Sequence, residues 1–232
     1  YADVTADSPI DTFRETFENP NNDFATRWTI TGNGAGDYSI VAAAGVAGGK
    51  VFRAGNNSGN DRTNLRYNTK IPYDPNKLYR MRVRMRRTAG TGRVYAGVYT
   101  YDNAGVAVAD QPNGDTGSLV CVYYEEPDSD WEVFTGYFSG HSTAGSPGPN
   151  PSPDSPGALK TGSAYFVPKL LLNYSAATGI MDVDEVVIDI LPEDADQIAE
   201  SSTKKWAGES GADVTAEHQG DINIDNIQDG SS

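Results

Sequence analysis

Hydrophobic and polar residues alternate with a period of two along most of the chain, which is typical of β-strands. In residues 78–87, four apolar side chains alternate with four arginines. The apolar set is Tyr79, Met81, Val83 and Met85, and the basic set is Arg80, Arg82, Arg84 and Arg86. A strand directs the two sets to opposite faces, whereas a helix would spread both around its axis. The same pattern predicts strands at residues 12–18, 27–31, 38–42, 50–54, 64–71, 78–87, 94–101, 119–124, 131–138, 164–172 and 183–190.

Turn-forming residues separate these segments, and no long helical pattern interrupts them. The spacing predicts an all-β fold, an antiparallel β-sandwich of the jelly-roll kind, with extended or short-helical terminal segments. Residues 140–162 are rich in Ser, Pro and Gly and are predicted to form a long surface loop. We expect residues 1–9 to be a linker and residues 10–192 to be the domain. Residues 193–232 are expected to be an acidic linker or tail, or part of a following module.

Composition narrows the function classes. The net charge of −14 argues against nucleic acid as a partner, because phosphates repel an acidic protein over long distances. The sequence has no apolar run of about 18 residues, so no membrane insertion is expected. The single cysteine, Cys121, lies in an apolar run, cannot form an intramolecular disulfide and is predicted to be a buried hydrophobic residue. The chain begins at Tyr1 without Met, so we expect it to be part of a longer or processed protein.

Three short motifs resemble those of jelly-roll carbohydrate-binding modules, the galactose-binding-like β-sandwiches. They are Phe-Glu at residues 17–18, Gly-Gly-Lys-Val-Phe-Arg at 48–53 and Met-Asp-Val-Asp-Glu-Val-Val-Ile at 181–188. The resemblance covers residues 10–192. In that family a structural Ca²⁺ often joins the first and last strands, which implies Glu18, the backbone of Lys50 and Asp184 as its ligands. The alternative is that Glu18 and Asp184 are ordinary solvated acids at strand ends.

A second resemblance concerns the ends of the chain. The segment Ala-Asp-Val-Thr-Ala occurs at residues 2–6 and again at 212–216, outside the predicted domain. The longer segment 206–216 resembles the repeated linkers of bacteriophage tail and tail-fibre proteins. Together the two resemblances imply a carbohydrate-binding-like domain carried on a phage tail, in the virion or otherwise extracellular. The implied partners are a cell-surface or extracellular polysaccharide, neighbouring tail subunits and further copies of the chain.

Tyrosines are the first candidates for ligand binding. Tyr95, Tyr99 and Tyr101 share one face of a predicted strand, and Tyr123 and Tyr137 are expected on neighbouring strands. Aromatic faces stack against the C–H groups of sugar rings, and tyrosine tolerates exposure. The alternative is a row of half-buried structural tyrosines, because tyrosine favours strands.

The arginine row is the second candidate. Like charges along one strand repel, so Arg80, Arg82 and Arg84 need opposing groups. One alternative is cross-strand pairing with acids such as Glu132 or Glu185, or plain solvation. The other is an anionic partner: an acidic polysaccharide, the phosphate of a lipopolysaccharide or an acidic neighbouring subunit.

The predicted function is non-catalytic binding of a glycan or host-surface receptor. A structural tail domain without a ligand, and an accessory binding module of a secreted polysaccharide-degrading enzyme, remain as alternatives. No nucleophile elbow, phosphate loop or metal-binding histidine pair is present. Glu125, Glu126 and Asp128 cluster in one predicted turn rather than facing each other as a glycosidase pair, and His141 falls in or beside the predicted loop.

Overall fold

The computed structural model describes residues 10–18, 24–32, 37–43, 49–55, 62–108, 118–143, 151–174 and 178–192. They lie within a compact unit, Ser8–Leu191, and its neighbour Pro192. The described elements are β1 (Ile10–Glu15), α1 (Phe24–Arg27), β2 (Trp28–Thr31), β3 (Tyr38–Ala42), β4 (Lys50–Ala54), β5 (Thr63–Tyr67), β6 (Ile71–Pro72), β7 (Leu78–Ala89), β8 (Arg93–Tyr101), β9 (Ser118–Glu125), β10 (Glu132–Ser142), β11 (Gly157–Lys160), β12 (Tyr165–Tyr174) and β13 (Ile180–Leu191).

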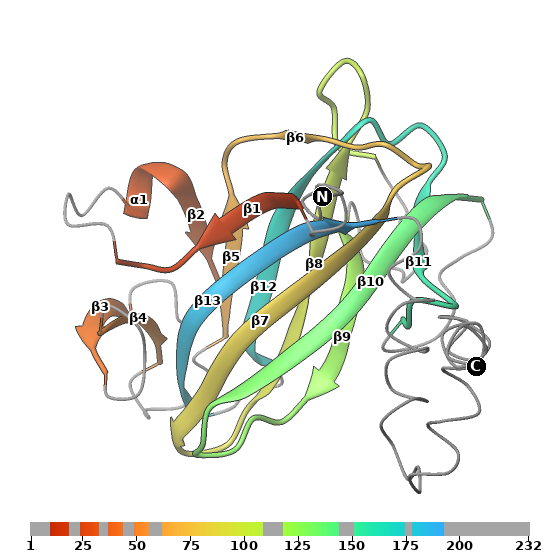
Figure 1. Cartoon of the computed structure of the whole chain (residues 1–232). Coiled ribbons are helices and arrows are strands. Elements are labelled where there is room, and N and C mark those ends of the chain that lie inside the picture. The colour runs from red at the N-terminus through yellow and green to blue at the C-terminus, as the bar shows by residue number, and fades with distance from the viewer. Residues whose placement is uncertain are drawn as a thin grey trace, which may run out of the picture. The chain divides into compact units, whose positions relative to one another are not determined.

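The described strands form two sheets (Figure 1). Sheet A has the order β11-β10-β7-β13-β4-β3, and β1 pairs with β13 beside β4. Sheet B has the order β2-β5-β12-β8-β9, and β6 pairs with the start of β12. All described pairs are antiparallel except β10 with β11. The predicted all-β sandwich is therefore confirmed, with this one parallel pair as an addition.

Most predicted strands appear within a few residues of their expected bounds, but three predictions were wrong in part. The predicted loop 140–162 contains the end of β10 and the whole of β11. His141 lies inside β10, where its Nε2 is 3.0 Å from the Ser163 carbonyl and its ring packs on Tyr73. The predicted strand 64–71 is two strands, β5 and β6, and the segment before Trp28 is the short helix α1. The pairing of β10 with β11 and the contacts of His141 join residues that are far apart in the chain, so the local sequence does not reveal them.

The inner faces of the two sheets form one core. The alternation of β7 places Tyr79, Met81, Val83 and Met85 inside, as predicted, and Val94, Ala96 and Val98 of β8 face them from sheet B. Cys121 is fully buried in this core, as predicted, and burial raises the pKa of its thiol. Trp28 is also buried.

A buried carboxylate organises the segment after β1. Glu15 is 4% exposed and accepts hydrogen bonds from the Phe17 backbone N–H at 2.8 Å and from Trp28 Nε1 at 2.9 Å. The Arg27 guanidinium also donates to it. These bonds satisfy the carboxylate and hold Phe17 at a positive φ of 59°, which brings its ring into the core.

The buried Tyr73 hydroxyl contributes to the stability of the core in a way that can be measured. It donates a 2.7 Å hydrogen bond to the Gly140 carbonyl, and burial raises its pKa above the ordinary 10.0. We expect Tyr73→Phe to lower the free energy of unfolding by about 1 kcal/mol at pH 7. Above pH 10.0 the Tyr73 hydroxyl ionises in the unfolded chain before it does so in the folded protein. The wild type therefore loses stability, and the difference in free energy of unfolding between wild type and Tyr73→Phe becomes smaller. Urea denaturation at neutral and alkaline pH measures both effects.

Tyr165→Phe is the control for this pair, because the Tyr165 hydroxyl makes no hydrogen bond within the described residues. It should leave the free energy of unfolding unchanged at neutral pH. The raised pKa of Tyr73 would be contradicted if the difference in free energy of unfolding between wild type and Tyr73→Phe stayed constant up to pH 11. That pH is about one unit above the ordinary tyrosine pKa.

Among the described residues, the structure contains no helix with the length and apolar character that a membrane span requires.

Candidate functional site

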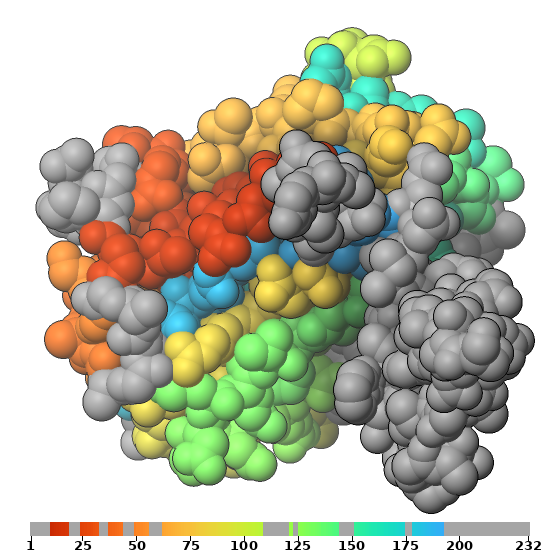
Figure 2. Space-filling model, viewed as in Figure 1, coloured from red at the N-terminus to blue at the C-terminus, as the bar shows by residue number. Residues whose placement is uncertain are grey.

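The outer face of sheet A carries the predicted arginine row. We call Arg80, Arg82, Arg84 and Arg86 of β7 the arginine ladder. Figure 2 shows this side of the molecule, where β1, β13, β7 and β10 follow one another across the surface. The neighbouring strand β13 directs buried acids toward the ladder, so the charges of the two strands oppose each other in register.

Each arginine of the ladder donates to an aspartate of β13. Arg80 makes two bonds to Asp189, at 3.0 and 2.8 Å, and Arg82 adds a third at 2.8 Å. Arg86 makes two bonds of 3.2 Å to Asp182, which also accepts two bonds from Arg53 of β4, at 2.6 and 2.9 Å. Arg84 donates to Asp184. Asp182 is 0% and Asp189 1% exposed, so these acids depend on the arginines for their hydrogen bonds.

The two acids suggested as examples of cross-strand partners, Glu132 and Glu185, make their described bonds to other groups, although Glu185 lies opposite Arg84 in the register. Glu132 accepts from the Asp128 backbone N–H, and Glu185 pairs with Arg14 of β1. The register irregularity between Val183 and Glu185 makes Asp184 an extra residue of β13, and Asp184 accepts the bond from Arg84. The ion pairs favour the structural alternative for the ladder, because the aspartates of the same sheet already receive its donors. The hydrogen bond to Asp189 raises the pKa of Arg80.

Trp131 lies at one end of the ladder. Its ring has the guanidinium carbons of Arg84 and Arg86 over it, at 4.9 and 4.4 Å from the centroid. The side chain is half-buried. The contacts are cation–π interactions that support the outer end of the ladder.

The outer face of sheet B carries the predicted tyrosine row. Tyr95, Tyr99 and Tyr101 point outward from β8 and are half-buried, whereas Ala96 and Val98 between them face the core. β12 lies beside β8 and adds Tyr165, in register with Tyr101, and Tyr174, which is 38% exposed. We call these five residues the tyrosine face. Ring contacts join Tyr99 to Tyr101 at 5.3 Å and Tyr95 to Tyr174 at 5.0 Å.

Two basic side chains lie over the rings of this face. The guanidinium of Arg66, from β5, is 4.9 Å from the centroid of Tyr99. The ammonium of Lys70 is 4.5 Å from the centroid of Tyr101 and donates to the Gly105 carbonyl at 2.9 Å. The sequence analysis missed Arg66, Lys70, Tyr165 and Tyr174. Alternation marks Arg66 and Tyr165 as outward residues, but only the strand order β5-β12-β8 brings them beside Tyr99 and Tyr101. Tyr174 follows a register irregularity after Leu171 and contacts Tyr95.

The structure divides the predicted ligand-binding set between two faces. Tyr95, Tyr99 and Tyr101 lie on sheet B, whereas Arg80, Arg82 and Arg84 lie on sheet A. Tyr137 does not join the tyrosine row as expected, because β10 pairs with β7 and places Tyr137 opposite Arg80. Tyr123 belongs to β9, next to β8, but its side chain lies outside the described residues.

The three predicted calcium ligands have the following contacts. The Glu18 carboxylate accepts the backbone N–H of Lys50 at 2.7 Å, so these two residues are in contact. Asp184 is instead engaged by Arg84 on the outer face of sheet A. Within the described residues, no three His, Cys, Asp or Glu side chains are grouped as a metal site requires. Calcium binding by Glu18, the Lys50 backbone and Asp184 stays a prediction.

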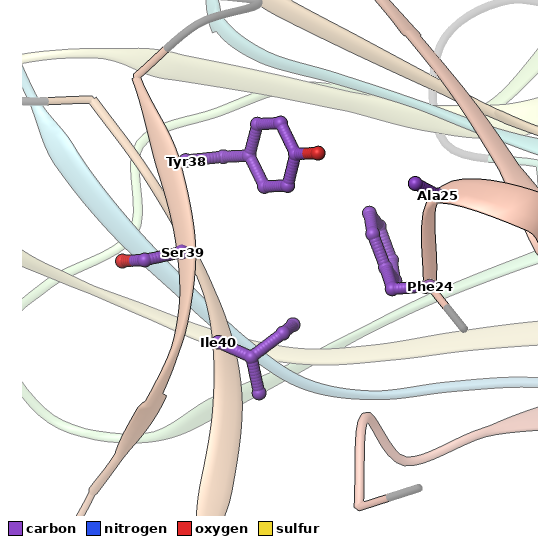
Figure 3. A pocket seen from close by; sticks show the side chains of 5 residues that line it. All are labelled: Phe24, Ala25, Tyr38, Ser39 and Ile40. Atoms are coloured by element: carbon purple, nitrogen blue, oxygen red, sulfur yellow. The ribbon is translucent and has the colours of Figure 1, made fainter. Parts of the chain in front are cut away.

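An open pocket of about 380 Å³ lies between α1 and β3 (Figure 3). Phe24, Tyr38 and Ile40 point toward the space, and Ser39 points away from it. The lining includes one phenol hydroxyl and no charged group. It therefore offers fewer polar contacts than the tyrosine face, and we do not assign the function to it.

Comparison of the sequence with protein-family models and with curated proteins finds no match. Solved structures with a similar arrangement of strands do exist. The CBM22-1 xylan-binding domain of Xyn10C from Paenibacillus barcinonensis aligns with 80% of this chain and 97% of its own, at 13% identity and a TM-score of 0.49. TmCBM61, solved with β-1,4-galactotriose, aligns with 74% of this chain and 96% of its own, at 11% identity and a TM-score of 0.41.

A phage protein is also among the similar structures. The enzymatically active domain of tailspike protein 4 of bacteriophage CBA120 aligns with 76% of this chain and 20% of its own, at 12% identity and a TM-score of 0.45. At these identities and TM-scores, the likenesses assign neither a family nor a function. The chain is an all-β, two-sheet sandwich that is structurally similar to carbohydrate-binding modules and matches no sequence family.

Proposed function

We propose that this chain is a non-catalytic carbohydrate-binding protein that holds a polysaccharide along the tyrosine face. The observation that carries the proposal is the row of half-buried tyrosines on the outer face of β8 and β12. Such rings present apolar faces to the C–H groups of sugars and hydroxyls to their oxygens. From Tyr95 to Tyr101 the row extends over about 20 Å, the rise of six strand residues, which suits an extended chain of several sugars.

The outer face of sheet A is less suited to this role. Its arginines and aspartates are held in ion pairs with each other, so a ligand would have to compete with hydrogen bonds already formed. The tyrosine face has no such competition at Arg66 and Tyr99, whose described contacts are with each other and with Tyr101. We therefore separate the two faces in function, with sheet A as support and sheet B as the binding surface.

The biological setting is a further part of the proposal. The segment at 206–216 that resembles phage tail linkers, and its partial repeat at residues 2–6, lie outside the described residues. A virion location, a host-surface polysaccharide as receptor, and contacts with tail subunits or other copies of the chain rest on that resemblance. The absence of catalysis rests on the sequence alone.

Tyr99→Ala tests the proposal. We expect the full chain to bind at least one soluble polysaccharide in affinity gel electrophoresis, and the variant to bind it about 10-fold more weakly. An aromatic–sugar contact of about 1.4 kcal/mol corresponds to that factor. Tyr137→Ala is the matched control, because Tyr137 is a half-buried tyrosine on the opposite sheet. It should bind like the wild type.

Circular dichroism and thermal denaturation confirm that each variant is folded before binding is compared. Equal weakening by Tyr99→Ala and Tyr137→Ala would mean that the tyrosine face is not the site. A folded wild-type chain that binds none of a broad set of polysaccharides would overturn the proposed function and favour a structural role.

A further inference from the structure

Four consecutive strands of sheet B have an unusual charge composition. The four strands β2, β5, β12 and β8 contain no Asp or Glu, whereas the whole chain has 32. They do contain Arg66, Arg93 and Lys169. Arg93 pairs with Glu126, at 2.7 Å, so Arg66 and Lys169 are the basic residues that define the outer side of β5 and β12.

Like charges also face each other on this sheet. Arg66 of β5 and Lys169 of β12 are directly opposite in the register, on the outer side. Two cations at opposite positions of antiparallel strands destabilise the pair unless an anion lies near them. On sheet A the corresponding problem of the arginine ladder is solved by the aspartates of β13. Strands β5 and β12, which carry Arg66 and Lys169, contain no Asp or Glu themselves.

Arg66 is in position to receive an anion. Among the described residues it forms no ion pair, and its contact is with the ring of Tyr99. A guanidinium over an aromatic ring is held there by the cation–π attraction while its N–H donors remain available at its edge. Such a group loses little conformational freedom when a carboxylate binds, which favours binding.

Lys70 gives the face a second cation. Its ammonium lies over Tyr101, the ring next to Tyr99, and is exposed. One of its three donors is used by the Gly105 carbonyl. Arg66 and Lys70 thus lie over consecutive rings of the row, so a sugar stacked on the tyrosines would have a cation beside it at two successive positions.

We infer that the tyrosine face selects anionic polysaccharides, whose carboxylates bind Arg66 and Lys70 while their sugar rings contact Tyr99 and Tyr101. This inference rests on the proposed carbohydrate-binding function and specifies its ligand class. An anionic partner was one alternative predicted for the arginine ladder on sheet A, and we now place it on sheet B. A carboxylate on the sugar would supply a counter-charge for Arg66, which forms no ion pair among the described residues.

The experiment compares each polysaccharide with its own neutral form. The full chain is tested by affinity electrophoresis against alginate, polygalacturonate and hyaluronan, before and after chemical reduction of their carboxyl groups to alcohols. We expect binding to at least one untreated polymer and at least 10-fold weaker binding to its reduced form. Raising NaCl from 50 to 500 mM should weaken binding to the charged form only.

Variants assign the effect to the site. Arg66→Gln should weaken binding to the charged polymer about 10-fold and leave weak binding to the reduced form unchanged. Arg82→Gln on the arginine ladder is the matched control and should change neither. Arg66→Lys, which keeps the charge and loses the planar group, should have an intermediate effect.

The outcomes separate this inference from the proposed function. Equal binding of charged and reduced polymers would overturn the anionic preference and leave carbohydrate binding in place. Preference for the charged form that is lost in Arg82→Gln but kept in Arg66→Gln would overturn the site. A folded chain that binds no polymer in either form would overturn both.

Discussion

Replacement of Asp182 by alanine is expected to lower the free energy of unfolding by about 3 kcal/mol. Asp182 is fully buried and accepts bonds from Arg53 and Arg86, so the substitution leaves two guanidinium groups without their counter-charge. Removal of one member of a buried ion pair costs about 3–5 kcal/mol. The side chains of Arg53 and Arg86 are 33% and 21% exposed, so water can hydrate them partly, which places the loss near the lower end.

Asp11→Ala is the matched control for this prediction. Asp11 also pairs with an arginine, Arg14, but the two side chains are 44% and 46% exposed. Exposed pairs contribute about 0–1 kcal/mol, so the control should stay within that range. Urea denaturation followed by circular dichroism measures both variants. If Asp182→Ala and Asp11→Ala lose the same small amount, the ladder is not a buried network and the division of roles between the sheets fails.

Replacement of Gly136 by alanine is expected to destabilise the protein by about 3 kcal/mol, the upper range for overpacking a core. Gly136 lies on the inner side of β10, opposite β9 of the other sheet. A Cβ at this position would lie 2.2 Å from the carbonyl oxygen and 2.8 Å from the Cβ of Cys121. The clash is with backbone, which cannot move aside without separating the two sheets.

Gly162→Ala separates this close approach from a general effect of replacing glycine. Gly162 has a φ of +97° but no atom within 4 Å of an added Cβ. Alanine there is strained by its backbone conformation alone, at a cost of about 1 kcal/mol. Thermal and urea denaturation rank the two variants. A Gly136→Ala protein as stable as Gly162→Ala would show that the sheets can separate at β9 and β10 without loss.

These two predictions describe a molecule whose faces have different tasks. On sheet A, acids on β13 neutralise arginines of β7 and β4, which ties the central strands together across their outer side. On sheet B, basic residues lie beside tyrosines on strands without acids. The charges on sheet A neutralise each other, and the two sheets share one hydrophobic core. The ion pairs of sheet A therefore also stabilise the position of the binding face on sheet B.

Local periodicity was sufficient to predict much of this fold. The alternation in β7 and β8 correctly separated core residues such as Met81 and Val98 from outward ones such as Arg82 and Tyr99. The apolar run around Cys121 correctly predicted its burial. Side-chain direction along a strand depends only on neighbouring residues, so it can be inferred without knowing the partner strands.

The amino-acid sequence was therefore enough to predict the all-β character, most strand positions and the inward or outward direction of side chains in regular strands such as β7 and β8. The tertiary structure alone decided which outward side chains are neighbours. It paired Arg80 with Asp189 rather than with Glu185, moved Tyr137 away from Tyr99, and brought Arg66 over the Tyr99 ring. The physical reason is that strand order and register arise from contacts between residues far apart in the chain, whose combination no local pattern specifies.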